Sequence, residues 1–156
     1  AWVDDVSHFQ TRWEGLRVTS NAGLGSIAQG TREWTDYAVE TEITPLLARR
    51  WGVAVRVQGR ERYYALMFDS REGGSHVSLV RRCHLETELA SERFAWELDR
   101  PYRIRLEAQG RTLRASIDGR LVFQTEDPDE RLRGGGVGLL VDTGSISTRK
   151  VRVRPV

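Results

Sequence analysis

The stretch YRIRLEAQGRTLRASIDGRLVFQTEDPD, residues 102–129, decides the fold class of this chain. Apolar residues occupy every second position from Tyr102 to Ala108 and polar residues fill the positions between them, which is the period of a strand with one buried face. Gln109-Gly110 and Asp118-Gly119 then interrupt the alternation. Asp-Gly between alternating runs is a strong hairpin signal, because a tight primed turn needs positive φ at both central positions. The stretch therefore predicts three antiparallel strands joined by two hairpins.

Alternating runs separated by turn residues recur along the rest of the chain, at the spacing typical of a sandwich or jelly roll. No segment favours a helix longer than a turn or two. We therefore expect an all-β fold, an antiparallel two-sheet β-sandwich, formed as a single domain over residues 1–156. The expected strands cover residues 16–19, 25–29, 36–44, 51–59, 63–69, 76–82, 85–92, 102–109, 112–118, 120–125, 136–142 and 149–154.

The composition is that of a soluble globular protein, with 39% hydrophobic and 29% charged residues. It holds no apolar run of membrane-spanning length and no long basic run, so neither a membrane nor a nucleic acid is expected as a partner. Lys150 is the single lysine among 24 basic residues, a bias typical of GC-rich bacterial genomes. The chain opens at Ala1 without a signal-like segment, which suggests a module excised from a larger protein. Composition does not decide between a bacterial cytoplasmic and a secreted location.

No catalytic motif is present: the chain lacks a nucleophile elbow, a phosphate-binding loop and a zinc-protease signature. Cys83 is the only cysteine, which excludes an internal disulfide and a cysteine-based zinc site. Glu40 and Glu42 share one face of an expected strand, and two carboxylates are the requirement of glycoside hydrolysis. Nothing more specific marks them, so the sequence favours a protein without an active site of its own.

No cofactor is expected, with one reservation. β-Sandwiches often carry a structural calcium, which needs six to eight oxygen ligands. The sequence offers acidic residues for such a site but no diagnostic spacing. The candidates are Asp4, Asp5, Asp127, Asp129 and Asp142.

Two neighbouring strands supply the candidate binding residues. In WGVAVRVQG (51–59) the valines are expected to face the core, which turns Arg56 and Gln58 to the opposite face. In YYALMFD (63–69) the set containing Tyr64 is expected in the core, which turns Tyr63 outward. The expected strand 76–82 is expected to be a sheet neighbour, which adds Arg82 to the same surface.

Tryptophan is abundant, with five residues in the chain, and its flat ring can stack on a sugar. Trp34 and Trp96 stand where strands begin and are expected to plug the ends of the sandwich. Trp51 follows a loop and is the tryptophan expected to be exposed. The candidate ligand-binding set is therefore Trp51, Arg56, Gln58, Tyr63 and Arg82.

Four segments carry a resemblance to a known family: WTDYAVETEITP (34–45), GVAVRVQGRERYYALMFD (52–69), LRASIDGRLVFQTEDP (113–128) and GGGVGLLVDTGSISTRKVRV (134–153). The chain resembles the concanavalin-like, laminin-G-like jelly-roll modules, and it is similar to those appended to bacterial carbohydrate-active or ADP-ribosylglycohydrolase-type enzymes. The resemblance implies a jelly roll, a carbohydrate ligand and a linked catalytic domain as partner. Residues 147–150 lack the acidic residue that calcium-bearing members often show there, which lowers the expectation of calcium.

Three functions follow as alternatives. The first is a non-catalytic carbohydrate-binding or accessory module, with hydrogen bonds from Arg56, Gln58 and Arg82 and a stacking surface at Tyr63 or Trp51. The second is a keto-disaccharide-type glycoside hydrolase that uses Glu40 or Glu42. The third is a structural domain that packs on a linked catalytic domain and would present a flat apolar patch.

Overall fold

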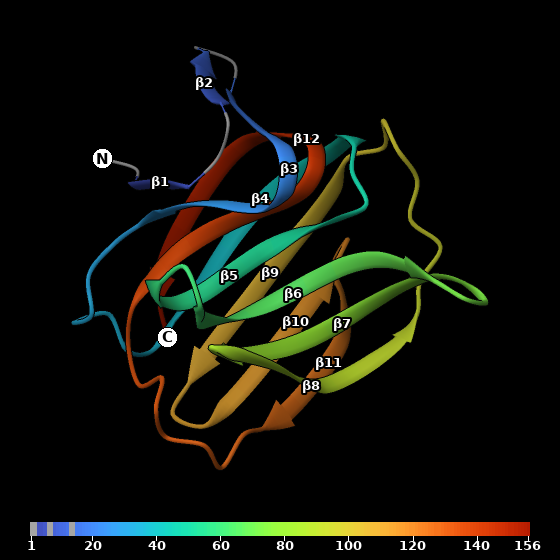
Figure 1. Cartoon of the computed structure of the whole chain (residues 1–156). Helices are drawn as coiled ribbons and strands as arrows, with labels where there is room; N and C mark the ends of the chain where they lie inside the picture. The colour runs from blue at the N-terminus through green and yellow to red at the C-terminus, as the bar shows by residue number, and fades with distance from the viewer. Residues whose placement is uncertain (1–2, 6–7, 13–14) are drawn as a thin grey trace.

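The computed structural model describes residues 3–5, 8–12 and 15–156, with side chains from Leu16 onward. No helix occurs in these residues, so the all-β prediction is confirmed (Figure 1). The strands of the described ranges are β1 (Val3–Asp5), β2 (His8–Arg12), β3 (Gly15–Gln29), β4 (Tyr37–Leu47), β5 (Arg50–Gly59), β6 (Arg62–Arg71), β7 (Gly74–Cys83), β8 (Leu85–Arg93), β9 (Tyr102–Gln109), β10 (Thr112–Ile117), β11 (Arg120–Glu126) and β12 (Gly136–Pro155).

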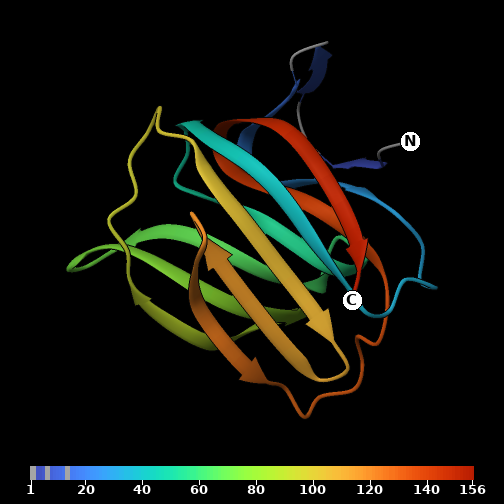
Figure 2. The ribbon, with the colours of Figure 1, turned by 180° about the vertical axis from the view of Figure 1, so that it is seen from behind.

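The strands form two antiparallel layers. One layer runs in the order β12-β5-β6-β7-β8 and faces the viewer in Figure 1. The other runs β12-β4-β9-β10-β11 and lies at the front when the molecule is turned round (Figure 2). The predicted hairpin stretch is β9–β10–β11, and Asp118 and Gly119 both have positive φ, at 51° and 81°, as the primed turn requires.

The two longest strands belong to both layers. The first part of β12 pairs with β5, and after a register shift between Asp142 and Gly144 its second part pairs with β4. β3 follows β12 along both parts and bends with it. Sequence reading expects two separate strands at each of these places. Both strands bend at turn-forming residues. In the sequence such residues indicate the end of a strand, but here the strands continue through them.

The main core lies between the layers and follows the strand alternation. Val53 and Val55 of β5 pack there with Tyr64, Leu66 and Phe68 of β6, as the sequence predicts. Trp34 and Trp96 are partly buried against this core, in agreement with their expected role. The Trp96 indole N–H donates to the carbonyl of Asp69 (2.9 Å), which fixes the loop that leads into β9.

Candidate functional site

The outer face of β5, β6 and β7 carries a second, smaller apolar cluster. It is formed by Ala54, Tyr63, Ala65, Met67, Val80 and Leu140, each no more than 2% exposed. No further layer of strands covers this face in the described part of the chain, so the burial comes from polar side chains that fold over the cluster. We call the outer surface of β5, β6 and β7 around this cluster the concave face.

An ion pair spans the concave face. The Arg50 guanidinium of β5 meets the Glu86 carboxylate of β8 at 2.9 Å, although β6 and β7 lie between the two strands. The ladders place Arg93, and not Glu86, opposite Arg50, so Glu86 is displaced along the strands as well as across three strand spacings of about 14 Å. An arginine and a glutamate anchored that far apart can meet above the sheet only where it curves toward them. Asp69 of β6 lies beside the same guanidinium, with its carboxylate 3.9 Å from Arg50 Nε.

Unpartnered polar atoms gather beneath this ion pair. Arg50 Nε, Tyr63 Oη, Ser78 Oγ and Arg82 Nε are buried without a hydrogen-bond partner, and they are four of the five such side-chain atoms found in the described residues. The fifth, Trp51 Nε1, lies on the other side of the sheet. Leaving a buried polar group unpaired costs about 1–3 kcal/mol. Such a concentration indicates a surface adapted to something other than stability alone.

The charges of the concave face act on Tyr63. Burial raises the pKa of the Tyr63 hydroxyl above its ordinary value, while the Arg82 guanidinium beside it opposes the rise. The hydroxyl therefore stays protonated at neutral pH and can both donate and accept a hydrogen bond.

One end of the concave face opens into a hollow of about 770 Å³. Leu140 and Leu24 continue the apolar floor into it, and Arg82, Glu61 and His84 stand at its edge. Glu61 accepts from His84 Nδ1 (3.2 Å) and from Arg82 Nη2 (3.4 Å). These two contacts lower the pKa of the Glu61 carboxyl, with the His84 hydrogen bond as the larger cause. Arg82 is thus held at the boundary between the hollow and the concave face.

The expectation that Trp51 is exposed is wrong. Its side chain is fully buried in the main core, where its ring stacks on Phe68 at a centroid distance of 4.0 Å. Trp51 stands two residues before Val53 on β5 and so shares the core face of the valines. The strand alternation therefore predicts a buried Trp51, but the loop residues before it make Trp51 look like part of an exposed loop. Trp51 offers no ring face to a ligand.

Arg56 and Gln58 do not join the concave face, contrary to the expected alternation. Arg56 has φ of 51°, and the β5–β6 register shifts between Val55 and Gly59, so the side-chain period breaks here. The buried Arg56 guanidinium donates to the carbonyls of Thr35 (3.0 Å), Gly110 (2.8 Å) and Leu132 (3.3 Å). Gln58 donates to the Gly134 carbonyl (2.8 Å) and accepts from Arg62. Both residues fasten loops.

Tyr63 and Arg82 do lie together on the concave face, opposite one another in the β6–β7 pairing. Tyr63 is only 2% exposed and its hydroxyl is buried too, so a ligand reaches it only if the side chains above it move aside. Their role in binding stays a prediction. Sequence reasoning missed Arg50, Ser78 and Glu86. Alternation does place Ser78 with Arg82, but the reach of Arg50 to Glu86 depends on sheet curvature, which a single sequence does not carry.

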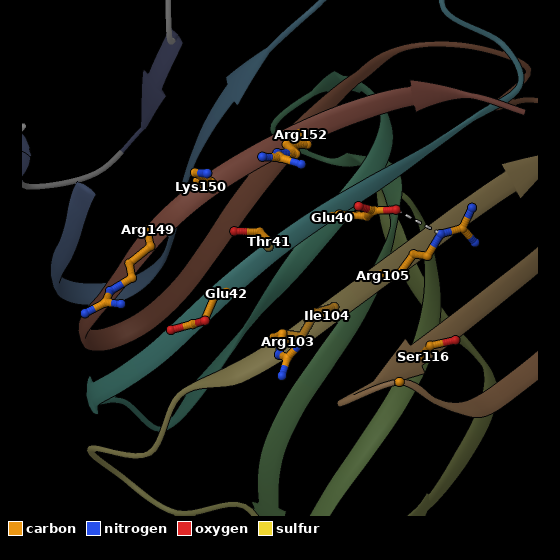
Figure 3. Close-up of a pocket in the computed structure, with 11 residues that line it drawn as sticks. Glu40, Thr41, Glu42, Arg103, Ile104, Arg105, Ser116, Arg149, Lys150 and Arg152 are labelled. Atoms are coloured by element: carbon orange, nitrogen blue, oxygen red, sulfur yellow. Dashed lines mark hydrogen bonds and ion pairs between the residues drawn. The ribbon is translucent and has the colours of Figure 1, made fainter. Parts of the chain in front are cut away.

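The opposite face of the sandwich holds a second depression, of about 980 Å³, on β4, β9 and β12 (Figure 3). Glu40 and Glu42 lie on this face, as expected from their spacing. Glu40 is bracketed by Arg105 (3.4 Å) and Arg154 (3.5 Å), whereas the Glu42 side chain makes no polar contact with the described residues. The hydrolase alternative stays a prediction without further support.

Two of the acidic residues proposed for calcium, Asp127 and Asp129, are engaged in other contacts. Asp127 is clasped by Arg81 (2.6 Å) and accepts from Tyr64 Oη (2.8 Å), and Asp129 pairs with Arg131. The side chains of Asp4 and Asp5 fall outside the described residues. Within the described ranges, no three acidic, histidine or cysteine side chains lie close enough together to hold a metal ion. The same residues include no helix that is long and apolar enough to cross a membrane.

Comparison with solved structures places this architecture among known folds. The carbohydrate-binding module CBM66 from Bacillus subtilis superposes with a TM-score of 0.84 over 98% of this chain and 94% of that one, at 19% identity. The chain has a jelly-roll sandwich fold. A galectin-like protein of unknown function from Bacillus subtilis (TM-score 0.73, 12% identity, covering 99% of this chain and 89% of that one) has a similar structure. The lumenal domain of VIP36, in a form with bound calcium and mannose, also has a similar structure (TM-score 0.73, 12% identity, covering 99% of this chain and 83% of that one).

Sequence comparison adds nothing to the structural likeness. No family model matches the chain, and no curated protein matches it. At these identities the structural neighbours establish the fold and leave function to be argued from the site.

Proposed function

We propose that the protein is a non-catalytic carbohydrate-binding module whose ligand lies on the concave face. The observation that carries the proposal is the set of four buried polar atoms without a hydrogen bond near the Arg50–Glu86 ion pair. Because these atoms are buried, the proposal requires the Arg50 and Glu86 side chains to move aside; a ligand that then brings hydrogen-bonding groups to them would remove the cost of leaving them without hydrogen bonds.

The chemistry of the face fits a sugar. Sugar hydroxyls both donate and accept, so they match the N–H donors of Arg50 and Arg82 and the hydroxyls of Tyr63 and Ser78. The small apolar floor that includes Met67 suits the C–H side of a pyranose or furanose ring. This combination of an apolar floor and a few convergent polar groups is typical of small-ligand sites.

The charges favour a neutral sugar. Two guanidinium groups, Arg50 and Arg82, are balanced by the nearby carboxylates of Asp69, Glu86 and Glu61. An anionic sugar would gain no net attraction there and would face like charges during desolvation.

The structural neighbours support a sugar ligand, since CBM66 is a carbohydrate-binding module and the VIP36 domain is described in a mannose-bound form. The accessory part of the proposal is that the module raises the concentration of a linked catalytic domain at its substrate. That part rests on the family resemblance of the sequence.

The test is a glycan array on the purified chain, followed by calorimetry of any hit with and without calcium. Ser78→Ala removes one of the unpartnered hydroxyls and should weaken binding about two- to tenfold, the range of one hydrogen bond. Thr125→Ala is the matched control, because it also removes one hydroxyl and Thr125 lies on β11, in the other layer and outside both depressions. Calcium should leave the affinity unchanged.

Two outcomes would contradict the proposal. Absence of binding to any glycan would favour the structural packing domain. Equal loss of affinity in Ser78→Ala and Thr125→Ala would place the ligand away from the concave face. Hydrolysis of a bound glycan, abolished by Glu40→Gln or Glu42→Gln, would favour the hydrolase alternative instead.

A further inference from the structure

The depression on the side of the sandwich opposite the concave face is strongly basic. We call it the basic depression. Figure 3 shows cationic side chains from β9 and β12 around the two glutamates of β4. Five cations against two carboxylates give its lining a net positive charge, whereas the whole chain carries only +2. The lining cations are Arg103, Arg105, Arg149, Lys150 and Arg152.

Most of these cations are unpaired. Arg105 binds Glu40 and Glu107, but Arg103, Arg149, Lys150 and Arg152 make no side-chain ion pair or hydrogen bond within the described part of the chain. Unpaired arginines also occur elsewhere in the described residues, at Arg32, Arg49, Arg93 and Arg120, whereas Arg71, Arg111 and Arg131 are ion-paired. The basic depression differs because four unpaired cations share one lining.

A β-bulge places two of the cations. In the β4–β12 ladder Thr148 pairs with Ile43 and Val151 with Thr41, so Arg149 and Lys150 together oppose the single residue Glu42. A bulge of this kind redirects side chains that regular alternation would send to opposite faces. Both residues consequently line the same depression.

We propose that the basic depression is a second binding site, which takes an anionic polysaccharide bearing carboxylate or sulfate groups. Arginine forks bind planar oxyanions in a bidentate manner, and the unpaired Arg103, Arg149 and Arg152 supply them from two strands on either side of β4. This site is independent of the sugar site on the concave face.

The lining favours a polysaccharide over other polyanions. It contains no aromatic residue on which a nucleobase could stack. Its one large apolar side chain, Ile104, is buried, so an acidic protein would find little apolar surface for the core of an interface. Ser116 and Gly119 instead leave a small, polar border suited to a hydroxylated chain.

The experiment measures binding of polygalacturonate and of heparin by calorimetry, with dextran as the neutral probe. Arg149→Ala should weaken binding about three- to fivefold, the effect of one exposed charge pair, and Arg149→Ala combined with Lys150→Ala should weaken it further. Glu42→Ala removes an opposing charge and should strengthen binding. Affinity should fall as salt is raised.

Arg93→Ala is the matched control, because Arg93 is an exposed arginine of β8, in the other layer and outside the depression. Thermal unfolding of each variant verifies that it is folded. An equal loss of affinity in Arg93→Ala and Arg149→Ala would overturn the proposal, since it would show attraction by overall charge. Tighter binding of polyglutamate or duplex DNA than of either polysaccharide would overturn it too. Ser78→Ala should leave this binding unchanged, which separates it from the sugar site.

Discussion

The hydroxyl of Tyr37 holds the backbone of Arg56 in its left-handed conformation. Tyr37 Oη accepts from the Arg56 amide (2.7 Å) and donates to the Gly135 carbonyl (2.6 Å). A non-glycine residue at positive φ is costly, and this contact, with the three carbonyls that the Arg56 guanidinium binds, offsets the cost. Burial, opposed by the nearby Arg56, raises the pKa of Tyr37 to about 12, so the hydroxyl keeps its proton.

Tyr37→Phe should destabilise the protein by about 1–3 kcal/mol, because it leaves the Arg56 amide without its buried partner. Tyr63→Phe provides the contrast. The Tyr63 hydroxyl is buried without a hydrogen bond of good geometry, and only the Arg82 guanidinium lies beside it, so its removal should change the free energy of unfolding much less. Denaturant unfolding of both variants tests the pair, and equal destabilisation would mean that Tyr63 has a partner in solution.

Trp51→Ala should cost about 3–5 kcal/mol, because it empties a fully buried site stacked on Phe68. Trp51→Phe keeps an aromatic ring there and should leave any glycan affinity intact, since residue 51 faces the core and not the concave face. The measurement is chemical denaturation together with calorimetry. A folded Trp51→Phe variant that has lost its ligand would show that the core assignment is wrong.

Gly144→Ala should disrupt the bend of β12. Gly144 has φ of 155°, and a Cβ at this position would overlap the backbone carbonyl of Leu47. Gly119→Ala is a useful comparison, because its site also has positive φ but open space around it. The thermal unfolding midpoint of Gly144→Ala should lie well below that of Gly119→Ala. Similar midpoints would show that backbone conformation alone decides the loss of stability.

Acid should weaken the region that follows β11. The side-chain and backbone hydrogen bonds of Arg131 lower the pKa of the Asp129 carboxyl from 3.8 to about 2 in the folded protein. Because the folded-state pKa is the lower one, this stabilisation is complete above pH 3.8 and is lost as the pH falls toward 2. Thermal midpoints of the native protein and of Asp129→Asn should therefore converge across that range, and a constant difference would contradict the assignment.

Strand alternation predicted the fold and the core well, because it depends only on local period. Val53, Val55 and Tyr64 face the main core, while Tyr63 and Met67 face away, as expected. The same rule failed at Arg56, where positive φ breaks the period, and nothing local in the sequence marks a non-glycine residue for that conformation. The same break in the alternation makes the expected orientation of Gln58 wrong as well.

The candidate site was accessible from sequence only in part. Tyr63 and Arg82 meet because their strands are neighbours in a hairpin, which a sequence can suggest. Arg50 and Glu86 meet because the sheet curves, and curvature is set by the packing of the two layers as a whole. The basic depression depends on a bulge whose two residues, Arg149 and Lys150, look like ordinary members of a strand.

The sharing of β12 between both layers has a consequence for how the molecule opens. If β12 detaches, the edges of β5 and β4 lose their hydrogen bonds in the same event, because one strand supplies both. Neither layer therefore forms a separable folding unit, and amide hydrogens on the two sides should exchange with solvent through one common opening. An opening of β12 at Leu140, on the concave face, would therefore also open the strand at Arg149, nine positions further along the same backbone.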